Sequence, residues 1–117
     1  MKVNELMNKV MNELEAKGFE VNFANGDTRQ ARAEKDGKSE RRPVDGYSFT
    51  HLYGYQVWLT VVHRHNGTEE NQSVDIEIMK WNASSGHAIA KERVNTKMSD
   101  RSIVNRVNKI AELFETL

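Results

Sequence analysis

Three segments in the second half of the chain alternate between aliphatic residues and other residues, and this pattern restricts the fold more than any other feature of the sequence. The aliphatic positions are Val57, Leu59 and Val61, then Val74, Ile76 and Ile78, and then Ala88, Ala90 and Val94. A period of two is typical of strands with one buried face. Asn66-Gly67 and residues 82–86 have turn composition and separate the three segments. The pattern therefore predicts a three-stranded antiparallel meander over residues 54–64, 74–81 and 87–94.

The two ends of the chain have the residue spacing of amphipathic helices. The first helix runs from Val3 to Lys17 and precedes Gly18, which stands where a left-handed helix cap belongs. The second begins at Ser99 or Asp100, and its apolar stripe is Ile103, Val104, Val107, Ile110, Ala111, Phe114 and Leu117. Alternation over residues 19–23 predicts a short strand directly after the first helix. We expect one α+β domain over residues 1–117, with both helices packed on one face of the sheet.

Residues 27–46 contain no large apolar residue over most of their length and have the composition of a basic excursion. Between positions 29 and 42, three acidic residues accompany six basic ones, which are Arg29, Arg32, Lys35, Lys38, Arg41 and Arg42. Two local structures fit this segment: a short helix that begins at Asp27, or a weak strand around Ala31 and Ala33. Because no residue here is large enough to anchor the segment to a core, we expect a mobile basic loop.

The pairing of the meander strands follows from keeping aliphatic residues on one face. In the first hairpin this rule pairs Leu59 with Ile78 and Val61 with Ile76. In the second hairpin it pairs Ile78 with Ala90 and Val74 with Val94. The second register also sets Glu77 opposite Lys91 and Asp75 opposite Arg93 on the other face. Opposite charges across an antiparallel pair stabilise it by roughly 0.2–1 kcal/mol each, so the charge pattern supports this register.

The face of the meander away from the helices carries an apolar cluster of Trp58, Met79, Trp81 and Ile89. Trp and Met are enriched at the centres of protein interfaces, so we interpret the cluster as a partner-binding surface. Two other interpretations stay open. Residues 47–53, which include four large apolar or aromatic side chains, can fold back over the tryptophans and make them ordinary core. The cluster can also be the contact surface of a homodimer.

The charge balance disfavours nucleic-acid binding, and the absence of cysteine excludes several kinds of site. The chain has 17 basic and 17 acidic residues and a formal net charge of zero, whereas dedicated nucleic-acid-binding proteins usually carry a basic excess. The lack of cysteine excludes disulfides, thiolate nucleophiles, iron–sulfur clusters and cysteine-bound zinc. The first residues contain no continuous apolar run, so we expect neither a signal peptide nor a membrane anchor, and a cytoplasmic location.

Two arrangements resemble parts of metal or catalytic sites, but each lacks a required element. His63 and His65 alternate on one strand, yet no spacing in the sequence supplies a third ligand. Asp45 followed by Glu77 and Lys80 is similar to a metal-dependent nuclease pattern. The spacing between Glu77 and Lys80 sends their side chains to opposite faces of a strand, so they cannot share one metal. We expect no enzymatic activity, no metal and no cofactor.

These observations favour a small binding or regulatory module that binds or inhibits another protein. Accessory proteins of phages and other mobile elements belong to this general kind, although no motif identifies one. The alternative is a nucleic-acid-binding module. In that case the basic residues between Arg29 and Arg42 contact phosphates, and the neighbouring aromatic residues Tyr47 and Phe49 stack on bases.

Overall fold

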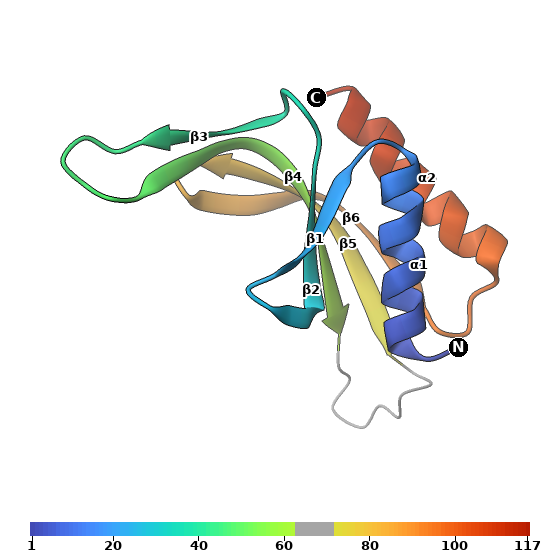
Figure 1. Ribbon diagram of the computed structural model, residues 1–117. Coiled ribbons are helices and arrows are strands. Elements are labelled where there is room, and N and C mark those ends of the chain that lie inside the picture. Colours follow the sequence, from blue (N-terminus) through green and yellow to red (C-terminus); the bar gives the residue numbers. More distant parts are fainter. Residues whose placement is uncertain (63–71) are drawn as a thin grey trace.

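The computed structural model describes residues 1–62 and 72–117, and in this part of the chain two helices pack on one six-stranded antiparallel sheet (Figure 1). The elements in chain order are α1 (Val3–Ala16), β1 (Glu20–Ala24), β2 (Asp27–Glu34), β3 (Ser39–Pro43), β4 (Thr50–Val62), β5 (Ser73–Asn82), β6 (Ser85–Asn95) and α2 (Asp100–Glu115). The predicted α+β class is therefore confirmed. None of the described helices is long and apolar enough to cross a membrane.

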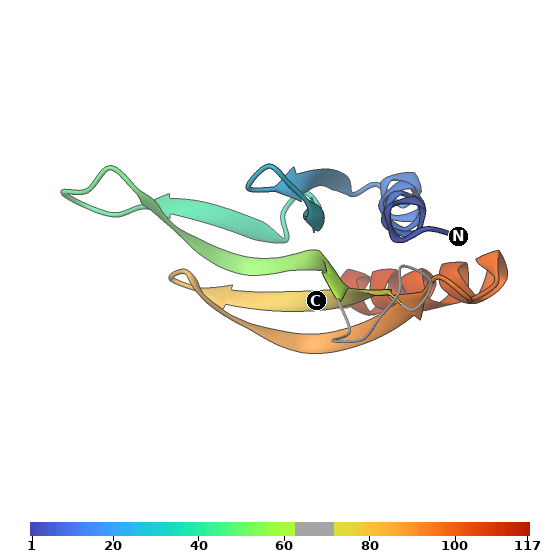
Figure 2. The same cartoon turned by 90° about the horizontal axis from the view of Figure 1, so that it is seen from below.

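The strands lie in the order β1-β2-β4-β5-β6, and β3 pairs with β4 outside this path. Residues 57–60 of β4 pair with β2, and residues 50–54 pair with β3, so β2 and β3 follow one another along the same edge of β4. Gly54 lies at the change of partner, with a φ of +98°. β3 and the first residues of β4 project away from both helices as a hairpin, which we call the arm (Figures 1 and 2).

The segment 27–46 is not a mobile basic loop, and that prediction was wrong. Most of it forms β2 and β3, which both pair with β4. Of the two local structures considered, the strand around Ala31 and Ala33 is the one observed, and both alanines are fully buried in the core. Their small side chains allow β2 to lie close beneath α1. The packing of these two alanine methyl groups under α1 therefore holds β2 to the core, without a large apolar side chain.

The register predicted for the second hairpin is confirmed: Ile78 pairs with Ala90 and Val74 with Val94. The register predicted for the first hairpin was wrong by two residues, because Leu59 pairs with Ile76. A shift of two leaves every side chain on its predicted face, so the face rule cannot distinguish the two registers. The observed register gives each of the three core-facing aliphatic residues of β4, Val57, Leu59 and Val61, an aliphatic partner, since Val57 meets Ile78.

Both helices and the aliphatic side chains of the sheet form one core. The predicted first helix is present and buries Leu6, Met7, Val10, Met11 and Leu14, and Gly18 after it has a φ of +91°. Ser99 caps α2, since its Oγ accepts a hydrogen bond from the main-chain N–H of Ser102 at 3.2 Å. Phe19 and Phe114 meet in this core with ring centroids 5.1 Å apart. Figure 2 shows α1 beside β1 and β2, and α2 beside β5 and β6.

Candidate functional site

We call the face of the sheet opposite this core the open face, because neither of the two described helices covers it. Arg32 of β2 lies on this face, since it pairs with Trp58. The face also holds the residues of β4, β5 and β6 that alternate with the core positions. These residues are Gln56, Trp58, Thr60, Asp75, Glu77, Met79, Trp81, Lys91 and Arg93. Their place on this face agrees with the sequence prediction.

Two tryptophans on the open face form the walls of a hollow of about 250 Å³, which we call the tryptophan hollow. Its lining is completed by Thr60, Glu77 and Met79. The indole rings of Trp58 and Trp81 have centroids 6.2 Å apart and planes tilted by 50°. Three members of the predicted cluster are thus brought together. Alternation along each strand puts Thr60 on the same face as Trp58, and Glu77 on the same face as Met79, but Thr60 and Glu77 become neighbours in the hollow only through the pairing of β4 with β5.

The local structure fixes both indoles in place. The Oε1 atom of Gln56, whose side chain is fully buried, accepts a hydrogen bond from the Nε1–H of Trp58 at 3.0 Å. Trp81 lies between Gly54 and Gly86 in the sheet register. A Cβ atom at Gly86 would lie 2.6 Å from the Trp81 ring, so the bare backbone there makes room for the indole. The two tryptophans are therefore held by their neighbours, and the shape of the hollow is defined before any partner arrives.

Two nitrogen atoms beneath the hollow are buried without a hydrogen-bond acceptor among the described residues. They are Nε2 of Gln56 and Nε1 of Trp81. A buried donor that loses its water without gaining an acceptor costs about 1–3 kcal/mol.

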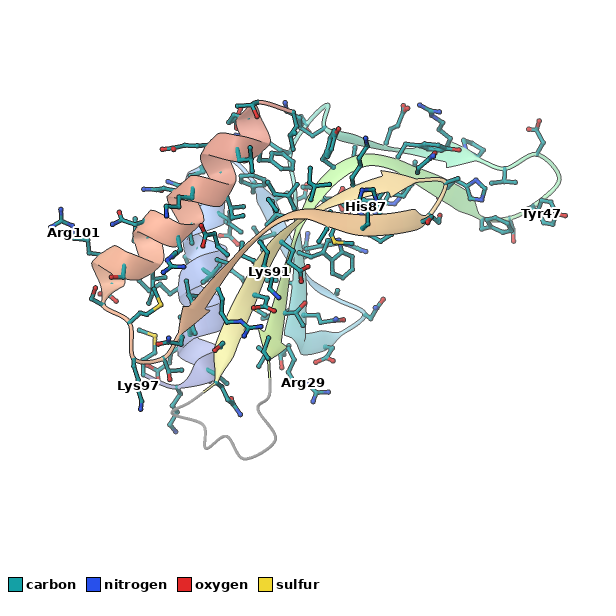
Figure 3. All side chains as sticks on the ribbon, turned by 180° about the vertical axis from the view of Figure 1, so that it is seen from behind. Arg29, Tyr47, His87, Lys91, Lys97 and Arg101 are labelled. Carbon is teal, nitrogen blue, oxygen red and sulfur yellow. The ribbon has the colours of Figure 1, made fainter. Side chains whose placement is uncertain are left out.

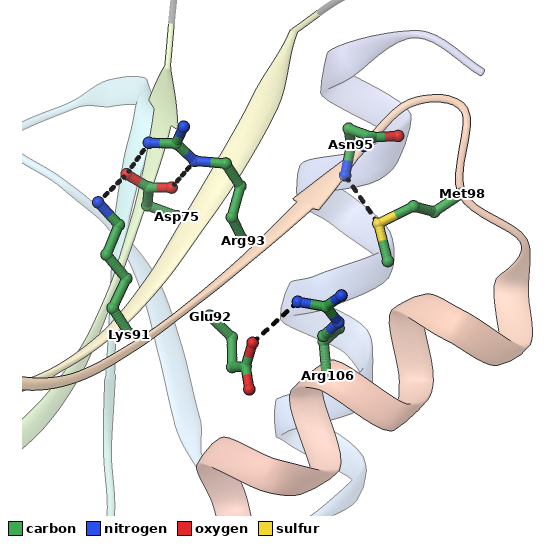
Figure 4. A network of polar contacts seen from close by, with 7 residues as sticks. All are labelled: Asp75, Lys91, Glu92, Arg93, Asn95, Met98 and Arg106. Atoms are coloured by element: carbon green, nitrogen blue, oxygen red, sulfur yellow. Dashed lines mark hydrogen bonds and ion pairs between the residues drawn. The ribbon is translucent and has the colours of Figure 1, made fainter.

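Figure 4 shows the charged group beside the hollow, in which Lys91 and Arg93 converge on Asp75. The Arg93 guanidinium donates to Asp75 from Nε at 2.6 Å and from Nη2 at 3.1 Å, and Lys91 Nζ lies 3.1 Å from the same carboxylate. Burial raises the pKa of Asp75, but hydrogen bonds from Arg93 and Lys91 outweigh this effect and hold the pKa below its usual value. The same contact raises the pKa of Arg93.

The second predicted charge pair differs from expectation in its contacts. Glu77 and Lys91 are directly opposite, as predicted, but the Lys91 ammonium binds Asp75 instead. Within the described residues, no basic nitrogen lies within 4.0 Å of the Glu77 carboxylate. Glu92, the residue between Lys91 and Arg93, turns to the helical face and pairs with Arg106 of α2 at 3.0 Å (Figure 4). Glu77 is thus the acidic group of this face without an ion pair in the described structure.

Ile89, the fourth residue of the predicted cluster, does not line the hollow. The register of the second hairpin shifts between Ile78 and Met79, so Met79 pairs with Ala88 and Ile89 is left without an opposite residue. This bulge leaves Ile89 41% exposed on the edge strand β6. An extra residue in one strand has no sequence signal in this hairpin, which is why the prediction placed Ile89 with the others.

Residues 47–53 do not cover the tryptophans, because they form the far part of the arm. Tyr47, Phe49, His51 and Tyr53 make a continuous row, with successive ring centroids 5.2, 5.8 and 6.5 Å apart. Figure 3 shows Tyr47 at the tip of the arm, far from α2, and its side chain is 69% exposed. The Arg42 guanidinium lies over the Tyr53 ring, 4.1 Å from its centroid. The arm is therefore a second surface with exposed aromatic residues.

The six basic residues of the segment 29–42 do not form one patch. Each has a partner within the protein: Arg29 with Asp27, Arg32 and Arg41 with Glu34, Lys35 with Glu115, Lys38 with the main-chain oxygen of Leu117, and Arg42 with Glu40. A hollow of about 410 Å³ at the base of the arm is lined by Lys38, Glu40 and Arg42, so its charges are already engaged. Most of the basic charge between positions 29 and 42 is therefore balanced locally.

No family model, no curated protein and no solved structure matches this chain significantly. No activity, ligand or partner is therefore carried over to it from another protein.

The residues considered for metal binding give no site in the described structure. His63 and His65 lie outside the described residues. Among the residues that are described, no group of three or more His, Asp or Glu side chains is placed to hold a metal ion. Glu77 lines the tryptophan hollow, whereas Lys80 is exposed and comes between Met79 and Trp81 in the strand alternation.

Proposed function

We propose that this protein is a binding module for another protein, and that Trp58, Met79 and Trp81 lie at the centre of the contact surface. The observation that supports this most strongly is a pair of preorganised, half-buried tryptophans on a sheet face that neither described helix covers. Protein interfaces typically have such an apolar, aromatic centre within a charged rim. Here the rim is the Asp75, Lys91 and Arg93 group.

The partner we propose is a different protein and not a second copy. In a twofold dimer the same patch faces itself, so each hollow would need a group that projects from the patch of the other copy. The long charged side chains beside the hollow include Lys91 and Arg93, which are both held by Asp75, and Arg32, which is paired with Glu34. Tyr47 and Phe49, which project most, belong to the arm. A regulatory or inhibitory role, as in accessory proteins of mobile elements, and the expected cytoplasmic location are part of this proposal.

The test is capture of partners from an extract of the source cell by tagged protein, with and without nuclease, followed by mass spectrometry. Trp58→Ala with Trp81→Ala is expected to abolish capture of a partner that survives nuclease. Thr60→Arg fills the hollow without removing an indole and is expected to have the same effect. Tyr47→Ser with Phe49→Ser on the arm is the matched control and should retain capture. Circular dichroism checks that each variant is folded.

Retained capture by Thr60→Arg and by the double tryptophan variant would show that the open face is not the binding surface. Loss of the partner from all variants, including the control, would point to a larger surface that extends over the arm. A homodimer is detected separately, as a doubled mass of the purified protein in light scattering, which Thr60→Arg then reduces to the monomer.

A second function, nucleic-acid binding by the arm, is favoured by one observation. The exposed row from Tyr47 to Tyr53 offers aromatic rings at a spacing that resembles successive stacking positions, with Arg42 beside it. The local pairing of the basic residues works against it. If this function is right, captured partners vanish with nuclease, and affinity for a single-stranded oligonucleotide falls steeply with salt and is lost in Tyr47→Ser with Phe49→Ser. Binding that does not respond to salt would exclude it.

A further inference from the structure

We propose that the tryptophan hollow accepts one positively charged side chain of the partner protein, an arginine or a lysine, with Glu77 as its counter-charge. This inference rests on the proposed function and specifies what the partner must present. In this proposal the two indoles and Met79 make apolar and cation–π contacts with the side chain. Glu77 forms an ion pair with its charged group.

The aromatic walls suit a cation. The ring faces of tryptophan attract a positive charge placed within about 6 Å of the ring centroid, and tryptophan is the most effective aromatic residue for this contact. Trp58 and Trp81 are tilted by 50° to each other and line the same hollow, so a group that enters it meets both rings. The Nε1–H of Trp58 already donates a hydrogen bond to Oε1 of Gln56, so it is not free to donate to a ligand. What Trp58 offers the hollow is its ring.

The carboxylate in the lining supplies the charge. Glu77 is the acidic residue that lines the hollow, and in the described structure it has no ion pair. The two cations nearest in the register, Lys91 and Arg93, are held by the neighbouring Asp75 and do not belong to the lining. Asp75 thus holds Lys91 and Arg93, and Glu34 holds Arg32, so these cations are engaged elsewhere and Glu77 is left for an external one. A carboxylate in the same lining as two aromatic rings favours a cation over a neutral apolar group of the same size.

The experiment uses the tryptophan fluorescence of the purified full chain, because the only two tryptophans of the sequence both line the hollow. N-acetyl-arginine amide is titrated in parallel with N-acetyl-citrulline amide, which has the same shape and no charge. We expect a saturable change in emission with the arginine compound and a much weaker one with the citrulline compound. Glu77→Gln is expected to weaken arginine binding about tenfold. Glu112→Gln, an exposed carboxylate on α2, is the matched control and should leave it unchanged.

Equal responses to the arginine and citrulline compounds, no response to either, or unchanged binding in Glu77→Gln would each overturn the inference. Trp58→Phe keeps an aromatic ring and should retain weakened binding, which separates loss of the site from loss of folding. The two proposals fail in different ways. If the arginine compound does not bind but Thr60→Arg still abolishes partner capture, the proposed binding function stands. The proposal that the partner inserts a basic side chain is then wrong. If the compound binds but capture ignores Thr60→Arg, the proposed function is wrong.

Discussion

Asp75 is an acidic side chain with only 6% of its surface exposed, and it lies on the sheet face that meets solvent. It stays charged there because two cations, Arg93 and Lys91, donate to its oxygens. The same contacts fix the long side chains of β6 beside the tryptophan hollow. A single residue therefore organises the rim of the candidate surface.

The pH dependence of stability follows from the lowered pKa of Asp75. In the unfolded chain an aspartate titrates at roughly pH 4, and in the folded protein it titrates lower. The contribution of Asp75 to the free energy of unfolding is therefore complete above the unfolded pKa and is lost as the pH falls through the folded pKa. We expect Asp75→Asn to lower the free energy of unfolding by about 1.5–3 kcal/mol at pH 7.

The measurement is urea unfolding of both proteins between pH 7 and pH 2. The difference between the wild type and Asp75→Asn should begin to shrink below about pH 4, where Asp75 of the unfolded chain becomes protonated, and should continue to shrink until the pH has fallen through the lower pKa of the folded protein. Exposed Asp36→Asn is a suitable control, because it should follow the wild type at every pH. A difference that stays constant down to pH 2 would show that the ion pairs of Asp75 do not contribute to stability.

The strand β4 connects both candidate surfaces, and Gly54 is the residue where it changes partner from β3 to β2. Tyr55 donates its main-chain N–H to the carbonyl oxygen of Lys38 at 2.7 Å directly after this bend. The backbones approach so closely at Gly54 that a Cβ atom would lie 2.3 Å from that same oxygen. The bend therefore requires glycine for two reasons, the positive φ and the missing side chain.

We expect Gly54→Ala to lower the free energy of unfolding by about 2–5 kcal/mol, since backbone strain and overpacking add. Urea unfolding followed by circular dichroism gives this value. Gly26→Ala is the matched control: its φ of +69° is also positive, but a Cβ atom there has nothing within 4 Å, so it should cost only about 1–2 kcal/mol. Equal losses in the two variants would mean that the close approach at Lys38 is relaxed in solution.

The whole molecule measures 49 × 30 × 20 Å, with the helices at one end and the arm at the other (Figures 1 and 2). The core lies at the helical end, and no residue between 39 and 54 belongs to its buried set. Phe114 of α2 is fully buried there and contacts Phe19, so it joins the last helix to the beginning of the sheet. The hydrophobic core and the two candidate surfaces therefore consist of different residues.

Phe114→Ala is expected to lower the free energy of unfolding by about 3–5 kcal/mol, because it removes a large buried ring from the centre of the core. Its neighbour Leu113 is 43% exposed, and Leu113→Ala should cost less than about 1 kcal/mol. Thermal and urea unfolding of the two variants provide the comparison. A small loss for Phe114→Ala would show that α2 is only loosely packed on the sheet.

Periodicity in the sequence by itself determined both helices, the three strands of the meander and, except at the bulge beside Ile89, the residues on each face. These features depend on neighbouring residues of one element, and a single apolar stripe or alternation specifies them. It also determined the second hairpin register, because the charges of Asp75 and Arg93 add to the aliphatic pattern there. The presence of Trp58, Met79 and Trp81 on one face follows from the same alternation.

Only the tertiary structure decided the pairing of β2 and β3, the first hairpin register and the lining of the hollow. Ala31 and Ala33 are too small to reveal a buried strand until a helix lies directly above them. Registers that differ by two residues keep the same faces, so only the complete set of cross-strand pairs distinguishes them. Glu77 enters the hollow while Lys91 turns to Asp75, because the choice among nearby charges depends on distances across strands, which sequence spacing does not encode.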